Sequence, residues 1–444
     1  MNRDDLIVIG GGLAGAEAAW QAAARGLRVK LYEMRPTRTT PAHQTAWLAE
    51  LVCSNSLKSA SLETAPGLLK EELRRVGSLV LRVADAARIP AGSALAVDRE
   101  QFARSISEAI LGHDLITVVR EEVRQIPPDT PTIVATGPLT SAALTEAIRS
   151  LSGARDLYFH DAISPIIDAQ SIDYDKVFFA SRHGEGDAED YLNCPLTEEE
   201  YLGFHTALTH AEVVPFHAFE EPHYFEACLP IEEIASRGFE ALAYGPMRPV
   251  GLSDGQGRRD FYAVVQLRRE DLMGSAFNMV GFQTKLTYPE QKRVFRLIPG
   301  LEQAEFLRFG SLHRNTYIHA PKLLRDTLQL RSRDDLFFAG QITGVEGYTE
   351  SVATGLLAGI NAVRLRQRRE LVVPPPTTAL GALVRYIAYA TAQPFQPMNI
   401  NFGLLPDLPR RVRDKGERRR QLVQRALAAA GRWWADVGEC ASQS

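Results

Sequence analysis

The sequence is poor in cysteine and has no long apolar run. No apolar stretch approaches the ~18 residues that a membrane span requires, and Asp4 and Asp5 precede the first apolar segment, unlike a secretory signal. We therefore expect a cytoplasmic protein without membrane contact. Without a C-x-x-C pair or a nearby histidine cluster, neither a disulfide framework nor a metal site is expected. The four cysteines are Cys53, Cys194, Cys228 and Cys440.

The chain also lacks a large net charge. Its 444 residues include 50 Lys and Arg against 54 Asp and Glu, a formal net charge of −4, and 45% of them are hydrophobic. Such a chain is neither disordered nor uniformly basic. As an average, this charge argues mildly against a nucleic-acid partner. At about 100–200 residues per domain, the length predicts two or three domains.

The first forty residues contain a dinucleotide-binding fingerprint. A strand is expected at Leu6 to Ile9, an alanine-rich helix at Glu17 to Arg25, and a second strand at Arg28 to Tyr32. Between them lies a glycine-rich turn, which lets backbone approach a pyrophosphate at the helix N-terminus; an acid about 20 residues on accepts ribose hydroxyls. An ordinary βαβ turn is the alternative. The expected cofactor contacts here are Gly10, Gly11, Gly12, Leu13, Ala14, Gly15 and Glu33.

Two later segments favour FAD over NAD. Expected strands at Thr132 to Ala135 and at Leu336 to Ala339 each end in a glycine-containing turn. After the second turn, a helix beginning near Thr349 would direct the positive end of its dipole at the negative charge of a reduced isoalloxazine ring. A surface loop is the alternative for residues 340–347. The additional expected FAD contacts are Gly137, Gly340, Gln341 and Gly347.

The FAD elements at both ends of the chain predict an interrupted domain. The middle is rich in aromatic residues, and prolines such as Pro195 and Pro230 are expected to break it into short elements. The predicted fold is α/β, with a Rossmann-like, glutathione-reductase-like FAD-binding domain interrupted by an α+β insertion domain. We expect residues 1–160 to form the first part of the FAD-binding domain and 161–320 the insertion. Residues 321–444 would form the second part, with a basic C-terminal helical segment.

Two cysteines lie in unusual surroundings. Cys53 belongs to a small polar loop, and Cys228 lies two residues after Glu226 and just before Leu229–Pro230. A buried, unreactive thiol is the alternative for each. Scattered basic residues in the insertion are expected to form mostly a solvated face, although some could bind a phosphate, a folate or a flipped base. They are Arg248, Arg268, Arg269, Lys285 and Arg314.

Several short motifs, taken together, are typical of one enzyme family. They are Gly10 to Glu17, Glu33 to Pro36, Cys53 to Ser56, Ala96 to Arg99, Tyr191 to Pro195, Phe225 to Pro230, His313 to Thr316 and Gly340 to Gly347. Over nearly the whole chain, this set resembles the folate- and FAD-dependent tRNA (uracil-5-)-methyltransferase family. A related family, the tRNA carboxymethylaminomethyluridine enzyme, shares the nucleotide elements and the late glycine-rich loop.

The resemblance implies methylation of C5 of the T-loop uridine at position 54 of tRNA. In that family, 5,10-methylenetetrahydrofolate supplies the carbon, reduced FAD carries it, and NADH or NADPH supplies electrons. Uracil C5 is a poor nucleophile until a thiolate adds to C6, so this chemistry requires cysteine. The implied catalytic residues are Cys53 and Cys228. We favour Cys228 as the nucleophile and Cys53 as the flavin-side thiol, with the opposite assignment open; no protein partner is required.

The C-terminal region changes the meaning of the net charge. Residues 410–432 hold nine basic and two acidic residues, a net charge of +7, which leaves −11 for the remainder. Clustered arginine is typical of phosphate contact, and a solvated helix face is the alternative. We expect this segment to contact tRNA. Two other functions stay open: a flavin-dependent oxidoreductase of a small metabolite, and a relative that modifies the wobble uridine of tRNA.

Overall fold

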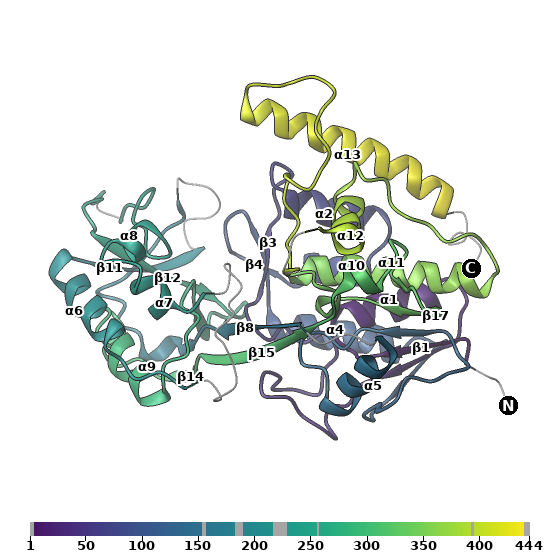
Figure 1. The fold of residues 1–444 in the computed structure, drawn as a ribbon. Helices are drawn as coiled ribbons and strands as arrows, with labels where there is room; N and C mark the ends of the chain where they lie inside the picture. The colour runs from purple at the N-terminus through teal and green to yellow at the C-terminus, as the bar shows by residue number, and fades with distance from the viewer. Residues whose placement is uncertain are drawn as a thin grey trace.

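The chain forms two lobes, shown in Figure 1. The structure is a computed structural model that describes residues 4–152, 157–182, 190–215, 229–254, 257–391 and 395–438. The larger lobe contains both ends of the described chain, and the smaller one is built from its middle. No helix in these residues is long and apolar enough to cross a membrane.

A six-stranded sheet forms the centre of the larger lobe. Its order is β16 (Gln329–Leu330), β17 (Arg333–Phe338), β7 (Thr132–Val134), β1 (Leu6–Ile9), β2 (Val29–Tyr32) and β6 (Ile116–Val119). All neighbours are parallel except β16 and β17. All four residues of β1 are buried, as in a parallel sheet covered on both faces. Because Leu336 pairs with Thr132, a late strand completes the sheet begun by the N-terminus.

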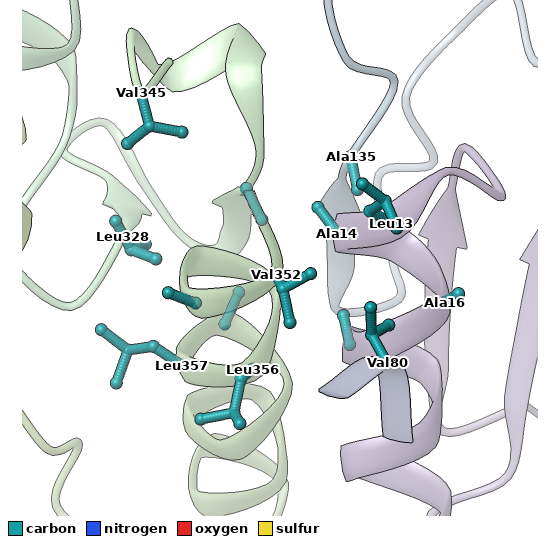
Figure 2. Packing of buried hydrophobic residues seen from close by; sticks show 14 of the residues in the cluster. Leu13, Ala14, Ala16, Val80, Ala135, Leu328, Val345, Val352, Leu356 and Leu357 are labelled. Atoms are coloured by element: carbon teal, nitrogen blue, oxygen red, sulfur yellow. The ribbon is translucent and has the colours of Figure 1, made fainter. Parts of the chain in front are cut away.

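Helices α1 (Leu13–Ala23) and α11 (Tyr348–Arg366) pack directly against each other beside this sheet (Figure 2). Glycine permits the close approach, because a Cβ on Gly355 would collide with the backbone of Ala14. Side chains such as Val352 fill the space around this contact in Figure 2. The late helix is therefore held against the helix of the glycine-rich turn.

Helix α1 begins earlier than the sequence predicted. We expected it to start at Glu17, but it starts at Leu13 with Gly12 as its N-cap. Glu17 is instead fully buried and accepts hydrogen bonds from Ser78 Oγ at 2.8 Å and from the Val80 N–H at 3.0 Å. The glycine-rich turn is thus itself the helix start, which places the first free N–H groups at the turn.

The remaining helices of the larger lobe cover the sheet and one another. They are α2 (Ala65–Arg75), α3 (Leu79–Ala86), α4 (Arg99–Leu111), α5 (Ala142–Ser152), α10 (Ala320–Leu323), α12 (Ala379–Tyr389) and α13 (Lys415–Gly438). Buried Glu72 of α2 caps α12 by accepting the N–H groups of Ala379 at 2.7 Å and Leu380 at 3.0 Å. Helix α13 lies across the top of the lobe in Figure 1 and contacts α2.

An antiparallel six-stranded sheet forms the smaller lobe. Its order is β10 (Phe178–Phe179), β11 (Tyr191–Leu196), β12 (Ala263–Arg269), β13 (Ala276–Met279), β9 (Ile166–Asp168) and β14 (Phe306–Arg308). In the described part of this lobe, four α-helices accompany the sheet: α6 (Glu198–Thr209), α7 (Ile231–Ala235), α8 (Ala241–Tyr244) and α9 (Tyr288–Phe295). Contrary to expectation, Pro195 lies inside a strand. It is tolerated because β10 pairs only with residues 192 and 193, so the ladder on that side has ended.

Two small sheets lie outside the two large ones. An antiparallel ribbon of β8 (Leu157–Ile163) and β15 (Ser311–Tyr317) carries the chain into the smaller lobe and back. A three-stranded sheet of β3 (Ser56–Ser59), β5 (Ala94–Val97) and β4 (Arg88–Ile89) follows the Cys53 loop. The expected divisions at 160/161 and 320/321 therefore fall inside β8 and α10. The chain crosses between the lobes along the ribbon, a pairing that separate strand patterns do not reveal.

The contact between α1 and α11 generates a stability prediction. Gly355→Ala should lower the free energy of unfolding by about 1–3 kcal/mol, because the new methyl group meets a backbone carbonyl that cannot rotate away. As a matched control, Gly203→Ala in exposed α6 has nothing within 4 Å of the new Cβ. The control should stabilise by up to ~1 kcal/mol through helix propensity. Urea denaturation measures both, and equal effects would contradict the packing argument.

Candidate active site

A cleft opens where the carboxyl ends of β1, β2 and β7 meet the start of α1. Gly10 has φ +104°, and a Cβ there would lie 2.5 Å from the Ala135 carbonyl oxygen. A Cβ on Gly15 would collide with the Gly10 carbonyl oxygen. Gly12 differs, since nothing lies within 4 Å of a Cβ added there. Gly10 and Gly15 thus allow the tight turn, and Gly12 leaves the cleft open.

The residues of this cleft fit the pyrophosphate of a dinucleotide. The N-cap of α1, Gly12, makes no side-chain cap hydrogen bond, and the first N–H groups of a helix have no partner within it. These N–H groups and the helix dipole favour a bound anion. An added Cβ on Gly12 would occupy the space that such an anion needs. The geometry is that of a phosphate cradle made from backbone.

Glu33 is fixed by four hydrogen bonds. Its Oε2 accepts from the Gly11 N–H at 3.0 Å, and its Oε1 accepts from the Arg35 N–H and Nε, each at 3.0 Å. Arg35 Nη2 adds a fourth at 3.2 Å. Burial opposes ionisation, but Arg35 outweighs it and lowers the pKa of Glu33. Glu33 is therefore a carboxylate that holds the glycine-rich turn in place. A ribose hydroxyl that donates to Glu33 must bond to a carboxylate oxygen that already accepts two hydrogen bonds.

Arg35 is a residue that our sequence reasoning did not single out. Its side chain is 2% exposed and also donates to Glu50 Oε2 at 3.0 Å. Its guanidinium group therefore lies between the carboxylates of Glu33 and Glu50 in the wall of the cleft. Its place in the Glu33 to Pro36 motif was the only available signal.

The late glycine-rich segment reaches the same cleft. Gly340 has φ +81°, and a Cβ there would lie 2.9 Å from that of Ala14. The short 3-10 helix η4 (Gln341–Thr343) follows, and Gly347, with φ +123°, is the N-cap of α11 without a side-chain cap. Two uncapped helix starts, from opposite ends of the sequence, therefore face connected cavities.

A second cavity continues from the first and contains Cys53. The two share Val52, Pro138, Leu139, Gln341 and Tyr348 in their walls. The Cys53 N–H and the Ser54 N–H both donate to Tyr348 Oη, at 2.9 and 3.2 Å. Gly347 lies in the wall of this second cavity, so the half-buried Cys53 and the start of α11 face one space.

The predicted site residues fall into four groups, and the structure describes three of them. Cys53 and Gly347 line the second cavity, and Gly15 lies behind the turn against Gly10. Cys228 lies outside the described residues, as does Cys440. Cys194 is fully buried, and burial raises the pKa of its thiol far above the ordinary value, consistent with an unreactive core cysteine. The residues in the first cleft are Gly10, Gly11, Gly12, Leu13, Ala14, Glu33, Gly137, Gly340 and Gln341.

The smaller lobe and the ribbon that joins the lobes contribute further polar residues. Arg268 of β12 lines the second cavity, together with His313 and Asn315 of β15. The expectation of a solvated basic face is wrong for Arg268, which is 6% exposed. Burial and the nearby Arg308 lower the pKa of His313 to about 4, so its ring is neutral at neutral pH. These side chains reach the second cavity only through contact between the lobes, which local sequence patterns do not encode.

A charged pair lies beside Gly347 in the same cavity. Glu350 is fully buried, and its Oε1 lies 3.7 Å from Lys58 Nζ and 3.2 Å from the Ile400 N–H, which donates to it. Lys58 has φ +65°, which is strained for a residue with a side chain. Among the described residues, no group of three or more His, Cys, Asp or Glu is arranged to hold a metal ion.

Known proteins match nearly the full length of the chain. Residues 5–370 match the family model described as glucose inhibited division protein A (GIDA). The methylenetetrahydrofolate–tRNA-(uracil-5-)-methyltransferase TrmFO of Geobacter sulfurreducens is 59% identical over 432 residues, covering 97% of this chain and 99% of its own. The protein of the same name from Moorella thermoacetica is 56% identical over 436 residues, covering 98% and 99%.

The fold also matches solved structures. Aquifex aeolicus GidA in its form II crystal aligns with a TM-score of 0.73 at 18% identity, covering 100% of this chain and 74% of the other. Its form I crystal gives a TM-score of 0.72 at 17% identity, covering 100% and 77%. At such low identity, these structures bear on fold alone. The predicted α/β fold class is confirmed.

The open cradle at Gly12 generates a binding prediction. Gly12→Asp should fold normally, because the new side chain meets no atom within 4 Å at Cβ, yet it places a carboxylate where the pyrophosphate is expected. FAD affinity should fall by more than tenfold in flavin fluorescence titrations. Gly12→Asn is the neutral control of equal size and should lose less. Equal affinity of the Asp variant and the unmodified protein would exclude this cradle as the binding site.

Proposed function

Because the chain belongs to the GIDA family and, within it, to the methylenetetrahydrofolate–tRNA-(uracil-5-)-methyltransferases, we propose the following reaction. The enzyme transfers a one-carbon unit from 5,10-methylenetetrahydrofolate to C5 of the T-loop uridine at position 54 of tRNA. FAD is the carrier and NADH or NADPH the reductant. We place the reaction in the cytoplasm, where these substrates meet.

The enzyme class predicted from the motifs is confirmed by this membership. The Geobacter and Moorella relatives, at 59% and 56% identity, carry the uracil-5-methyltransferase name over almost their whole length. Neither alternative function, the small-metabolite oxidoreductase or the wobble-uridine enzyme, has support from them.

The observation that carries the proposal is the continuity of the two cavities. The nucleotide cleft leads past Tyr348 into a space that holds Cys53 and polar residues of the smaller lobe. A cofactor held by the glycine-rich turn would therefore reach a thiol and the mouth of a substrate site. When bound, reduced FAD supplies the carrier of the one-carbon unit and the hydride that completes the methyl group.

The chain's own residues have separate tasks in this proposal. A thiolate must add to uracil C6, which moves negative charge onto C5. We assign this step to Cys228, which lies among residues 216–228 outside the described structure, and the flavin-side role to Cys53. Neutral His313 can donate or accept one hydrogen bond at the cavity wall without adding charge. Backbone N–H groups at the start of α11 favour negative charge beside them.

The C-terminal segment offers a surface for the tRNA backbone. Arg418 is paired with Asp407 at 3.0 Å, and Arg425 donates to backbone carbonyls. Helix α13 is anchored through buried residues such as Leu422 and Ala426, and Trp433 packs against the core. Within the described part of the chain, six basic side chains of the segment form no ion pair or hydrogen bond. They are Arg410, Arg411, Arg413, Lys415, Arg419 and Arg432.

Incubation with a T-loop minihelix RNA, methylenetetrahydrofolate and NADH should yield 5-methyluridine. Cys228→Ala and Cys53→Ala should each abolish the product. RNA carrying 5-fluorouridine at the target should separate their roles, since a covalent protein–RNA complex requires the thiol that adds to C6. The complex should be lost in Cys228→Ala and kept in Cys53→Ala. The reverse pattern would exchange the two assignments, and flavin-loaded protein without product would reject the reaction.

Removal of the exposed C-terminal charges should weaken tRNA binding. Arg411→Gln with Arg413→Gln should lower affinity several-fold and reduce the slope of log K against log salt by roughly 0.7–0.9 per lost phosphate contact. The control double variant, Arg104→Gln with Arg149→Gln, removes two exposed arginines of α4 and α5, on the opposite side of the lobe from α13 in Figure 1. Equal slopes for both variants would place the tRNA elsewhere.

A further inference from the structure

Three arginines from both lobes converge on the loop that carries Cys53. Arg268 is the next-to-last residue of β12 in the smaller lobe, Arg308 ends β14, and Arg99 begins α4 of the larger lobe. Arg268 is 6% exposed, and the side chain of Arg99 is 17% exposed. Each of the three interacts electrostatically with Cys53. Arg268 and Cys53 line one cavity, so the half-buried cysteine lies in a positively charged setting, with its Sγ 3.9 Å from the Ala162 carbonyl oxygen.

Hydrogen bonds fix this arrangement. Arg268 Nε donates to Asn55 Oδ1 at 2.8 Å, and Asn55 Nδ2 donates to the Arg269 carbonyl oxygen at 2.9 Å. On the other side, Arg99 donates to the Leu51 carbonyl oxygen. The loop is thus held on both sides of Cys53, once by each lobe.

The partner of Arg99 comes from the smaller lobe. Glu270 accepts from Arg99 Nε at 2.8 Å and from Nη2 at 3.1 Å, a two-bond pair across the lobe boundary. Burial disfavours the charge of Arg99, but Glu270 outweighs it and raises its pKa. Arg308 Nη2 donates to the Ala42 carbonyl oxygen at 3.0 Å, and Ala42 lies in the wall of the Cys53 cavity.

Among the side chains that the structure describes, the charges around Cys53 have a positive balance. Glu270 neutralises one arginine, His313 is neutral, and Lys58 is paired with Glu350. Glu346 accepts from Gln341 and adds one negative charge farther along the wall. Burial raises the pKa of Tyr348, so its hydroxyl stays protonated. Glu270 also acts on Arg268, and Glu50, which is bonded to Arg35, acts on Arg308. Three guanidinium groups around the Cys53 loop thus face two carboxylates, one of them shared with Arg35, and the remaining positive charge belongs to Arg268 and Arg308.

We propose that the smaller lobe ionises Cys53: docking of Arg268, with Arg308, holds the thiol as a thiolate at neutral pH. Arg268 is then a positioning residue that acts through Cys53, by its charge and by its bond to Asn55. An opposite charge within a few ångströms favours the ionised form of a thiol, and the thiolate is the reactive species. The inference rests on the proposed function, in which Cys53 has the flavin-side role. It concerns only the ionisation of the Cys53 thiol.

Alkylation of Cys53 by iodoacetamide tests this inference. Peptide-resolved mass spectrometry of the flavin-loaded protein gives the rate at Cys53 alone across a pH series. The apparent pKa should lie below the ordinary thiol value of about 8.5. Arg268→Gln should raise it and slow alkylation at neutral pH several-fold, with rates converging at high pH. Arg268→Lys should restore most of the rate, and Arg293→Gln, which removes an exposed arginine paired with Glu290, should change nothing.

A second variant gives a shift of opposite sign. Glu270→Gln keeps an acceptor for Arg99 but removes the negative charge, so the apparent pKa of Cys53 should fall and alkylation below it should accelerate. A merely structural role would slow both variants equally at every pH, and that result, or an unchanged pKa in both, would overturn the inference. The assay uses neither RNA nor folate. Loss of methylation with a low Cys53 pKa would therefore reject the proposed function alone.

Discussion

The contact between α1 and α11 is the constraint on which the site depends. Helices this close require residues without side chains at the crossing, and Gly355 meets the backbone of Ala14 there. That contact fixes the late glycine-rich segment against the turn at the start of the chain, so that two uncapped helix starts face connected cavities. A glycine in a helix costs about 1 kcal/mol in propensity, and here the geometry of the site depends on it.

The second constraint is the junction between the lobes. The Arg99–Glu270 pair and the bonds of Asn55 cross it at the loop of Cys53. A buried ion pair of this kind contributes little net stability, because desolvation offsets much of the attraction. Its effect is on placement, since the pair and the bonds of Asn55 form together in this docking of the smaller lobe. The thiol and the walls of its cavity therefore take their positions together.

The sequence predicted the local features of the site well. Gly10, Gly12 and Gly340 were predictable because a tight turn or a helix start requires particular residue types at adjacent positions in the sequence. The start of α1 was misplaced because an acid at position 17 suggested a first helical turn, whereas Glu17 is buried and binds residues 61 and 63 positions away. Arg35 was not singled out, and Arg268 was only one of five basic residues expected to lie mostly on a solvated face. Packing sets the burial of both, and Arg268 bonds to Asn55 of the other lobe.

The charged residues show most clearly why composition alone does not predict the role of a residue. The average of −4 joins a basic segment to an acidic remainder, but the same residue type also has opposite fates within this chain. Arg411 and Arg413 are exposed, where their charge is screened over about 10 Å by salt and can meet a phosphate. Arg268 is buried beside a thiol, where water cannot screen it. Exposure, which only the fold determines, decides whether an arginine recruits a substrate or tunes a reactive group.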